Sequence, residues 1–194
     1  MKAEKVAKII RTVTIPPVQV CTLLLLLYFM KRNVFANISQ LLLSIFFLMA
    51  VPVLAYPLAA AIPRYRGREG QRKLAFILSL AGYTTAVAYG LLAGVGHNLM
   101  LVYLAYFFSI VMLTVFNRGL KLRASGHACS VVGPLLLAIH FIGWKSVLPC
   151  VALLAAVTWA SLSLKRHTRE ELWWGGVSAM LAFALAFPIS LQFV

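Results

Sequence analysis

The chain has 194 residues, of which 62% are hydrophobic and only 11% charged, and its mean hydropathy is +0.93. This composition excludes a water-soluble globular fold, because too few polar residues remain to cover a surface. The net charge of +14 would suggest a nucleic-acid partner for a soluble protein. In a membrane protein such a charge is typical of cytoplasmic connections, so we expect membrane lipids and no nucleic acid as partners.

The predicted elements begin with an amphipathic segment at residues 1–12. Its basic side chains recur at every third position with valine and isoleucine between them, a pattern suited to a helix on an anionic membrane surface. Apolar segments of about the length needed to cross a bilayer follow. They are 13–30, 38–62, 74–95, 98–116, 127–143, 146–164 and 172–193. The sequence therefore predicts an all-α integral membrane helix bundle with about seven transmembrane helices, forming a single membrane domain over residues 1–194.

The basic residues predict the orientation of this bundle. We assume that successive connections alternate between the two sides of the membrane. Fifteen of the 18 lysines and arginines then lie on the same side as the N-terminus. The other three, on the opposite side, are Lys31, Arg32 and Lys145. The positive-inside rule then places the N-terminus in the cytoplasm and the C-terminus outside the cell membrane. The connection 64–73 carries five of the fifteen and would attract anionic lipid headgroups.

Acidic residues and cysteines limit the chemistry. The chain has no aspartate, and its only carboxylate side chains are Glu4, Glu69, Glu170 and Glu171. Membrane enzymes that hold Mg²⁺ need several converging carboxylates, so we expect neither a metal nor another cofactor. Three cysteines in apolar segments lack metal-ligand spacing and are expected to be small packing residues; they are Cys21, Cys129 and Cys150.

The first polar cluster, called the basic motif, spans residues 118–127 at the start of the fifth predicted span. A helix N-terminus offers unpaired backbone N–H groups and the positive end of the helix dipole, and three nearby cations add charge. The motif is therefore suited to binding phosphate through Arg118, Lys121, Arg123, Ser125 and Gly126, with His127 beside them. The alternative interpretation is a serine-capped helix that follows an ordinary cytoplasmic connection.

The second cluster, called the histidine motif, spans residues 165–171 between the last two spans. If the final helix begins near Thr168, His167 and Glu171 lie one turn apart on the same face. The carboxylate can then accept the Nδ1–H of the imidazole, which leaves the Nε2 lone pair for a nucleophile or general base. The alternative is a surface histidine with a helix-start glutamate that the dipole stabilises.

Together the two motifs resemble the type 2 phosphatidic acid phosphatase superfamily, whose pattern is a basic motif, then P-S-G-H, then S-R-x5-H-x3-D. Residues 125–127 match the middle motif, with Ala124 at its proline, and His167 and Glu171 stand at the last histidine and aspartate. The similarity covers residues 118–176 and is strongest to a short bacterial branch that has a basic residue two positions before the serine, here Arg123. Where the family pattern has an arginine six residues before the last histidine, this chain has Ser161.

The resemblance implies a metal-independent lipid phosphatase that works through a phosphohistidine. The predicted topology places its site at the cytoplasmic face of the membrane, which we expect to be a bacterial cell membrane. His167 would attack phosphorus, His127 would protonate the leaving oxygen, and Glu171 would orient His167. Phosphate would be bound by Arg123, Lys121, Ser125, Gly126, Arg118 and Arg166. The substrate would be a phosphatidate, a phosphatidylglycerol-phosphate-like lipid or a polyprenyl phosphate or pyrophosphate.

Two alternatives remain from the sequence. One is a catalytically impaired relative that binds anionic phospholipid without turnover, which the serine at position 161 favours. The other is a small transporter, for which charges inside the spans would be expected, and the spans contain almost none. His140 lies 13 residues beyond His127, about 20 Å deeper along the same span, and is expected to form a helix–helix hydrogen bond rather than join the site.

Overall fold

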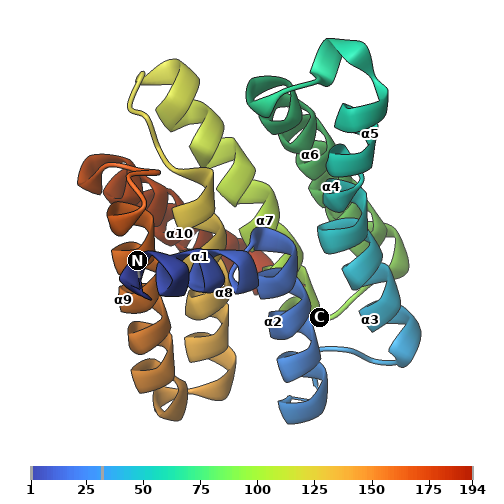
Figure 1. The fold of residues 1–194 in the computed structure, drawn as a ribbon. Coiled ribbons are helices and arrows are strands. Elements are labelled where there is room, and N and C mark those ends of the chain that lie inside the picture. The colour runs from blue at the N-terminus through green and yellow to red at the C-terminus, as the bar shows by residue number, and fades with distance from the viewer. Residues whose placement is uncertain (1, 32, 194) are drawn as a thin grey trace.

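The computed structural model describes residues 2–31 and 33–193, so that Arg32, one of the three cations assigned to the external side, lies outside the described residues together with Met1 and Val194. The described residues fold into helices joined by short connections, with no strand among them (Figure 1). Helices long and apolar enough to cross a membrane are Ile38–Ala61, Glu69–Ala93, His97–Gly119, Trp144–Ser163 and Arg169–Ser190. The prediction of an all-helical chain with membrane-spanning helices is confirmed.

The helices follow the predicted apolar segments, with breaks where proline interrupts the backbone hydrogen bonds. Pro52 and Pro57 fall in the second segment, which is divided into α3 (Ile38–Ile45), a π-helical turn η1 (Phe46–Ala50), α4 (Val51–Val53) and α5 (Ala55–Ala61). The other helices are α1 (Lys2–Val13), α2 (Pro16–Met30), α6 (Arg68–Ala93), α7 (His97–Thr114), α8 (Gly126–Ile142), α9 (Val147–Ser163) and α10 (Arg169–Ser190). Short turns adjoin them: η2 (Pro63–Tyr65), η3 (Val115–Gly119) and η4 (Trp144–Ser146).

The predicted number of seven spans is not confirmed. Helices α2 and α8 contain 15 and 17 residues. At 1.5 Å per residue both are shorter than a hydrocarbon core of about 30 Å. Joined to α1, from which it bends by 58°, α2 becomes long enough to be a sixth span. The bend falls at Ile15, whose extended backbone precedes Pro16 and Pro17, because a residue before proline is disfavoured in a helical conformation.

Helix α1 occupies the segment predicted to lie on the membrane surface. Its apolar residues Val6, Ile9 and Val13 are exposed, as a lipid-facing side requires, while Ala7 is fully buried. The helix packs against α9 and lies across its end (Figure 1). This tertiary contact was not predicted from the sequence, and it brings the N-terminal segment to the same end of the bundle as both polar motifs.

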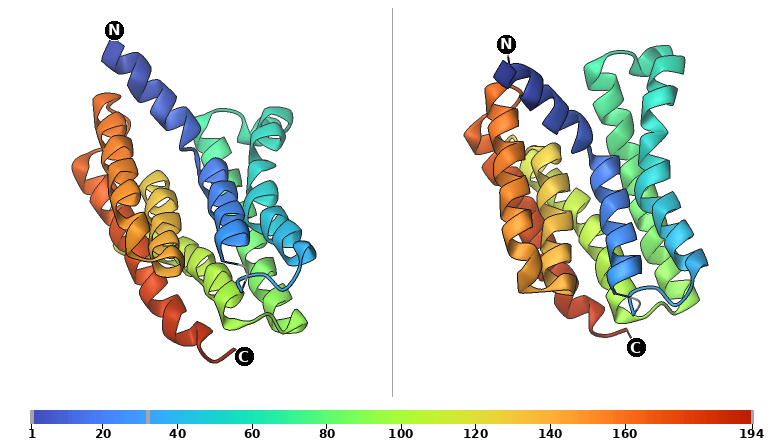
Figure 2. Two further views of the ribbon diagram at one scale, coloured as in Figure 1. Left: turned by 90° about the horizontal axis from the view of Figure 1, so that it is seen from below. Right: turned by 60° about the horizontal axis from the view of Figure 1, so that its bottom comes forward.

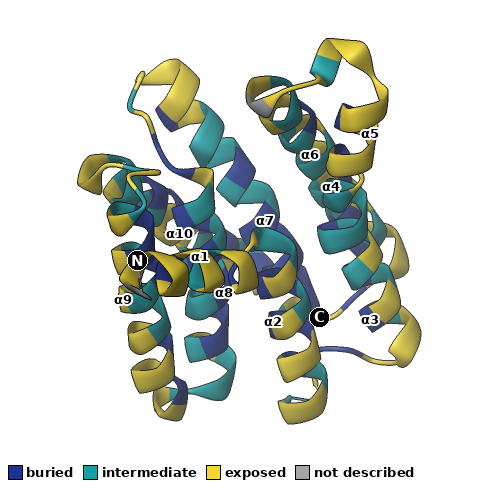
Figure 3. Ribbon diagram, in the orientation of Figure 1, coloured by how far each residue is buried: buried dark blue, intermediate teal, exposed yellow. Residues whose placement is uncertain are grey.

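The centre of the bundle is α7, in which the run 99–106 is buried without interruption. Helix α10 packs along α7 and α8, and α6 packs on the other side of α7. Figure 3 shows buried residues gathered on these facing sides and exposed ones on the outer surfaces. Large apolar side chains on the outside, such as Phe29, Leu92 and Leu148, are 74–90% exposed, which suits contact with lipid rather than water.

The connections divide between the two ends of the bundle (Figure 2, right view). The N-terminus lies at one end with the α5–α6, α7–α8 and α9–α10 connections, and the C-terminal end of α10 lies at the other with the α2–α3, α6–α7 and α8–α9 connections. The basic motif and the histidine motif therefore share one end of the protein.

Candidate active site

Local capping fixes where the two motif helices begin. Ser125 caps α8, and its Oγ accepts a hydrogen bond from the N–H of Ala128 at 3.2 Å. Thr168 caps α10 in a reciprocal arrangement with Glu171: its Oγ1 accepts from the Glu171 N–H at 3.1 Å, and Glu171 Oε2 accepts from the Thr168 N–H at 3.3 Å. Such a capping box follows from the T-x-x-E sequence alone. It places His167 immediately before the helix.

The backbones of the two motifs are in direct contact. The N–H of Ser125 donates to the carbonyl oxygen of Glu171 at 2.9 Å. One turn further along α10, Gly175 faces the same segment, and a Cβ there would lie 2.4 Å from the Ser125 carbonyl oxygen and 2.8 Å from Cβ of Ala128. A glycine is thus required for the first turn of α10 to approach the start of α8 so closely. This contact sets the distance between the two motifs.

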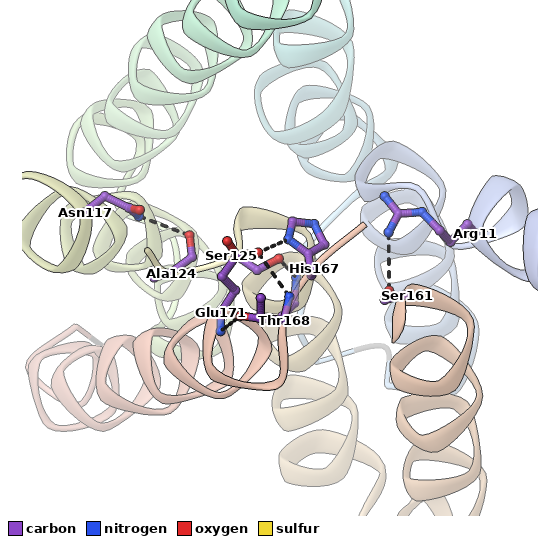
Figure 4. Close-up of polar contacts among 9 residues, drawn as sticks. Arg11, Asn117, Ala124, Ser125, Ser161, His167, Thr168 and Glu171 are labelled. Atoms are coloured by element: carbon purple, nitrogen blue, oxygen red, sulfur yellow. Dashed lines mark hydrogen bonds and ion pairs between the residues drawn. The ribbon is translucent and has the colours of Figure 1, made fainter. Parts of the chain in front are cut away.

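The expected pairing of His167 with Glu171 is present in the structure (Figure 4). Nδ1 of His167 lies 2.9 Å from Oε2 of Glu171, and the two side chains are only 15% and 22% exposed. If the carboxylate accepts the proton on Nδ1, Nε2 carries the lone pair. The geometry therefore leaves the nucleophilic nitrogen of the ring on the side away from Glu171.

A cavity of about 1120 Å³ lies between α1, α2, α6, α7, α8 and α10, and it contains both motif histidines. His127 and His167 both line it and lie close enough for their charges to interact. Its polar part also includes Arg72, Asn117 and Arg118, whereas its deeper walls are apolar, among them Val20, Leu137 and Phe183. The cavity therefore has a cationic end and a hydrophobic interior.

Two unsatisfied polar atoms border the same cavity. Nε2 of His127 and Oη of Tyr106 are shielded from solvent and have no hydrogen-bond partner within the described part of the chain. Buried polar groups are nearly always paired, so unpaired ones lining a cavity are typical of positions that a polar ligand occupies. Tyr106 lies on α7 and was not identified from the sequence, because a tyrosine in an apolar run is ordinarily a packing residue.

The predicted phosphate-binding residues are not all brought together. Arg118 and Gly126 line the main cavity, while Arg166 lies with His167 and Glu171 around a smaller adjoining pocket of about 380 Å³. Arg123 is exposed and close enough to Glu171 for their charges to interact, and Lys121 is exposed and lines neither space. The N–H of Ser125, expected to contact phosphate, is instead occupied by the Glu171 carbonyl oxygen. That part of the prediction is wrong, because the packing of α10 on α8 uses this donor.

Three cations that were not expected at the site line the cavity, and they are Arg11, Arg72 and Lys73. Arg11 was assigned to the membrane surface and Arg72 to a connection. In the structure Arg72 belongs to the first turns of α6, which begins at Arg68 rather than near residue 74. Arg11 donates through Nη1 to Oγ of Ser161 at 3.3 Å (Figure 4). Arg11 is one of four regularly spaced basic residues in the N-terminal segment, so the sequence pattern gave no signal that distinguishes it from the other three.

His140 lies outside the cavity, as expected from its depth. Its ring contacts the edges or faces of Phe141, Phe183 and Phe187, with centroids 4.9–5.7 Å apart. The expected helix–helix hydrogen bond is not found among the contacts of the described residues, and aromatic packing against α10 takes its place. The described residues also contain no group of three or more histidine, cysteine, aspartate or glutamate side chains placed to hold a metal ion.

Comparison of the chain with protein-family models, curated proteins and solved structures finds no match. The geometry of the cavity is therefore the basis for assigning a function.

Proposed function

We propose that this protein is a membrane phosphatase that removes phosphate from a lipid phosphate or pyrophosphate, as a divergent relative of the type 2 phosphatidic acid phosphatases. One observation carries the proposal: two histidines from separate motifs line one cavity, and one of them is paired with a carboxylate at 2.9 Å. A carboxylate-oriented imidazole next to a second imidazole and several cations is an arrangement suited to phosphoryl transfer.

In the proposed reaction, Nε2 of His167 attacks phosphorus in line and forms a P–N bond while the bond between phosphorus and the lipid oxygen breaks. A proton on Nε2 of His127 passes to the leaving oxygen, which yields the lipid alcohol, or the lipid monophosphate from a pyrophosphate. Water then attacks the phosphohistidine, His127 takes a proton from that water, and inorganic phosphate leaves. Glu171 holds the His167 ring and stabilises its positive charge in the intermediate. Cations of the cavity stabilise the charge on the phosphoryl oxygens.

The apolar walls of the cavity support a lipid rather than a soluble phosphate ester. Leu137 lies ten residues beyond His127 on α8, and hence about 15 Å deeper in the bundle. A substrate whose phosphate lies between the histidines can therefore place its first chain atoms against hydrocarbon side chains. Burial of each methylene would contribute about 0.8 kcal/mol to binding.

Phosphate release tests the function. The purified chain in detergent is incubated with a phosphatidate, a phosphatidylglycerol phosphate, a polyprenyl phosphate and a polyprenyl pyrophosphate, each with excess EDTA. We expect inorganic phosphate to be released from at least one lipid at a rate unaffected by the chelator. Binding of these lipids without release would instead support the rival function, a lipid-binding relative without turnover, which the occupied N–H of Ser125 favours.

We further propose seven passes through the cell membrane, with the N-terminus and the active site in the cytoplasm. The support is the charge asymmetry together with the alternation of connections between the two ends of the bundle (Figure 2). The short helices α2 and α8 would then cross a locally thinned bilayer.

Reporter fusions to the full chain are expected to show the two termini on opposite sides. Fluorescent protein at the N-terminus should fluoresce, and alkaline phosphatase at the C-terminus should be active because it folds only outside the cytoplasm. The inverse pair, fluorescent protein at the C-terminus and alkaline phosphatase at the N-terminus, serves as the control. A cytoplasmic C-terminus would contradict seven passes and agree with six.

The pH profile is expected to extend to the acid side of neutrality. Burial lowers the pKa of His167 from 6.5, and the charges of Arg11 and Arg72 lower it further, against the opposing hydrogen bond and charge of Glu171. Attack requires unprotonated His167, so activity is present above this pKa and is lost as the pH falls through it. The acid limb of kcat/KM should therefore lie below pH 6.5.

Glu171→Gln should move this acid limb to a still lower pH, because the carboxylate charge that raises the pKa of His167 is removed. Rates measured between about pH 4 and pH 8 on both proteins check the two expectations. A wild-type limb above pH 6.5, or a limb that moves upward in the variant, would contradict the assignment of His167 as the nucleophile.

A further inference from the structure

Arg11 is held at the cavity by a contact between distant parts of the chain. It lies in the last turn of α1, and its guanidinium donates to the hydroxyl of Ser161 on α9, which is fully buried. Ser161 is a neutral partner, and this contact positions the guanidinium at the cavity.

The charge of Arg11 reaches both histidines. Among the described residues it is the arginine that lies close enough to interact electrostatically with His127 and with His167, whereas Arg72 interacts with His167. Arg118 lines the cavity with its guanidinium 5.7 Å from the ring centroid of Phe76. An anion between the two imidazoles would therefore have Arg11 among its positively charged neighbours, with Arg72, Lys73 and Arg118 lining the same cavity.

Figure 4 shows where the guanidinium of Arg11 lies relative to His167 and Ser161. In this view the imidazole of His167 lies between Glu171 and Arg11. Arg11 reaches this position because the 58° bend before Pro16 turns α1 across the end of α9, where buried Ala7 allows close packing. A straight continuation of α2 would carry Arg11 away from the cavity.

We infer that Arg11 binds the phosphoryl group of the substrate through its guanidinium, so that the docked N-terminal helix supplies a phosphate-binding residue to the active site. The inference rests on the proposed phosphatase function for its substrate, and on the contacts of Arg11 for its geometry. A planar guanidinium can hold two phosphate oxygens at once, which a lysine ammonium cannot do. Helix α1 is then part of the catalytic apparatus as well as a surface helix.

The test compares the full chain with Arg11→Ala, Arg11→Lys, Ser161→Ala and Lys8→Ala. Lys8 is the matched control, because it lies on the same helix, carries the same charge, is exposed, and pairs with Glu4 at 2.7 Å away from the cavity. Two quantities are measured in detergent with EDTA: calorimetric binding of inorganic phosphate, and KM and kcat for the lipid phosphate that is hydrolysed. The melting temperature of each variant reports whether α1 packing survives.

We expect Arg11→Ala to weaken phosphate binding by about 10-fold to 100-fold, as for the loss of charge-assisted hydrogen bonds, and to raise KM accordingly. Arg11→Lys should bind with intermediate affinity, since the charge remains and the two-oxygen contact is lost. Ser161→Ala should cost about threefold, because the charge stays while its position loosens. Lys8→Ala should bind like the wild-type chain.

Equal binding by Arg11→Ala and Lys8→Ala would overturn the inference, and so would an absence of phosphate binding by the wild-type chain at millimolar phosphate. A loss in Ser161→Ala as large as in Arg11→Ala would also overturn it, because helix docking alone would then explain both. If Arg11→Ala does not fold, Arg11→Lys supplies the test instead. Phosphate affinity in Arg11→Lys equal to that of the wild-type chain would then overturn the inference. Arg11-dependent phosphate binding without hydrolysis of any lipid would refute the phosphatase function and leave the inference standing.

Discussion

Replacing His167 with asparagine is expected to abolish phosphate release. Asparagine is similar in size and polarity but has no nitrogen lone pair available for attack, so the covalent step is lost. We expect kcat to fall by at least about 10³-fold, equivalent to about 4 kcal/mol of transition-state stabilisation. The rate of phosphate release, measured with EDTA on the lipid that the wild-type chain hydrolyses, checks this.

The control for this variant is His140→Asn, which removes an imidazole that does not line the cavity and packs on the rings of Phe141, Phe183 and Phe187. It should keep nearly the wild-type rate. Trapping with ³²P-labelled lipid adds a direct readout, since an acid-labile, base-stable phosphoprotein should form in the wild-type chain and not in His167→Asn. Hydrolysis by His167→Asn at the wild-type rate would refute the proposed nucleophile.

Gly175→Ala is expected to have the second large effect, although this residue touches no substrate. The added Cβ would lie 2.4 Å from the carbonyl oxygen of Ser125, a backbone atom that no change of rotamer can move aside. Overpacking of this kind costs about 1–3 kcal/mol and separates the start of α8 from the start of α10. A shift of about 1 Å between His127 and His167 can lower the rate by about 10²-fold.

Gly176→Ala is the matched control, because it lies next in the same helix and its Cβ would meet only Cγ2 of Val132 at 3.7 Å, an ordinary contact. Both substitutions add the same helix propensity, about 1 kcal/mol, so the difference between the two variants isolates the clash. We expect a lowered melting temperature and kcat in Gly175→Ala and wild-type values in Gly176→Ala. Indistinguishable variants would show that the close approach of α10 to Ser125 is not needed for the site.

Much of the local geometry could be predicted from the sequence. The spacing of His167 and Glu171 predicts their pairing once a helix begins at Thr168, and the T-x-x-E pattern predicts that start. Ser125 caps α8, which was the alternative interpretation of the basic motif. These features depend on residues within one helical turn, where backbone geometry leaves little freedom.

The cations of the site could not be predicted in the same way. Ser161 and Arg11 are 150 positions apart, and their contact depends on the bend before Pro16 and on the packing of α1 against α9. The basic motif indicated Lys121 and Arg123 because they are close in sequence, yet neither lines the cavity. Proximity along an irregular connection does not determine direction, because its dihedral angles are set by contacts elsewhere.

By itself the sequence determined that this chain is a helical membrane protein and where its two polar motifs lie. It also determined the contacts within one helical turn of each motif. Hydropathy and helical periodicity are properties of neighbouring residues, so they can be read along the chain. Only the tertiary structure decided that α10 uses the N–H of Ser125, that Arg72 and Arg11 line the cavity, and that both histidines share it. The reason is physical: crossing angles and bends follow from the packing of whole helices, and they decide which distant side chains converge.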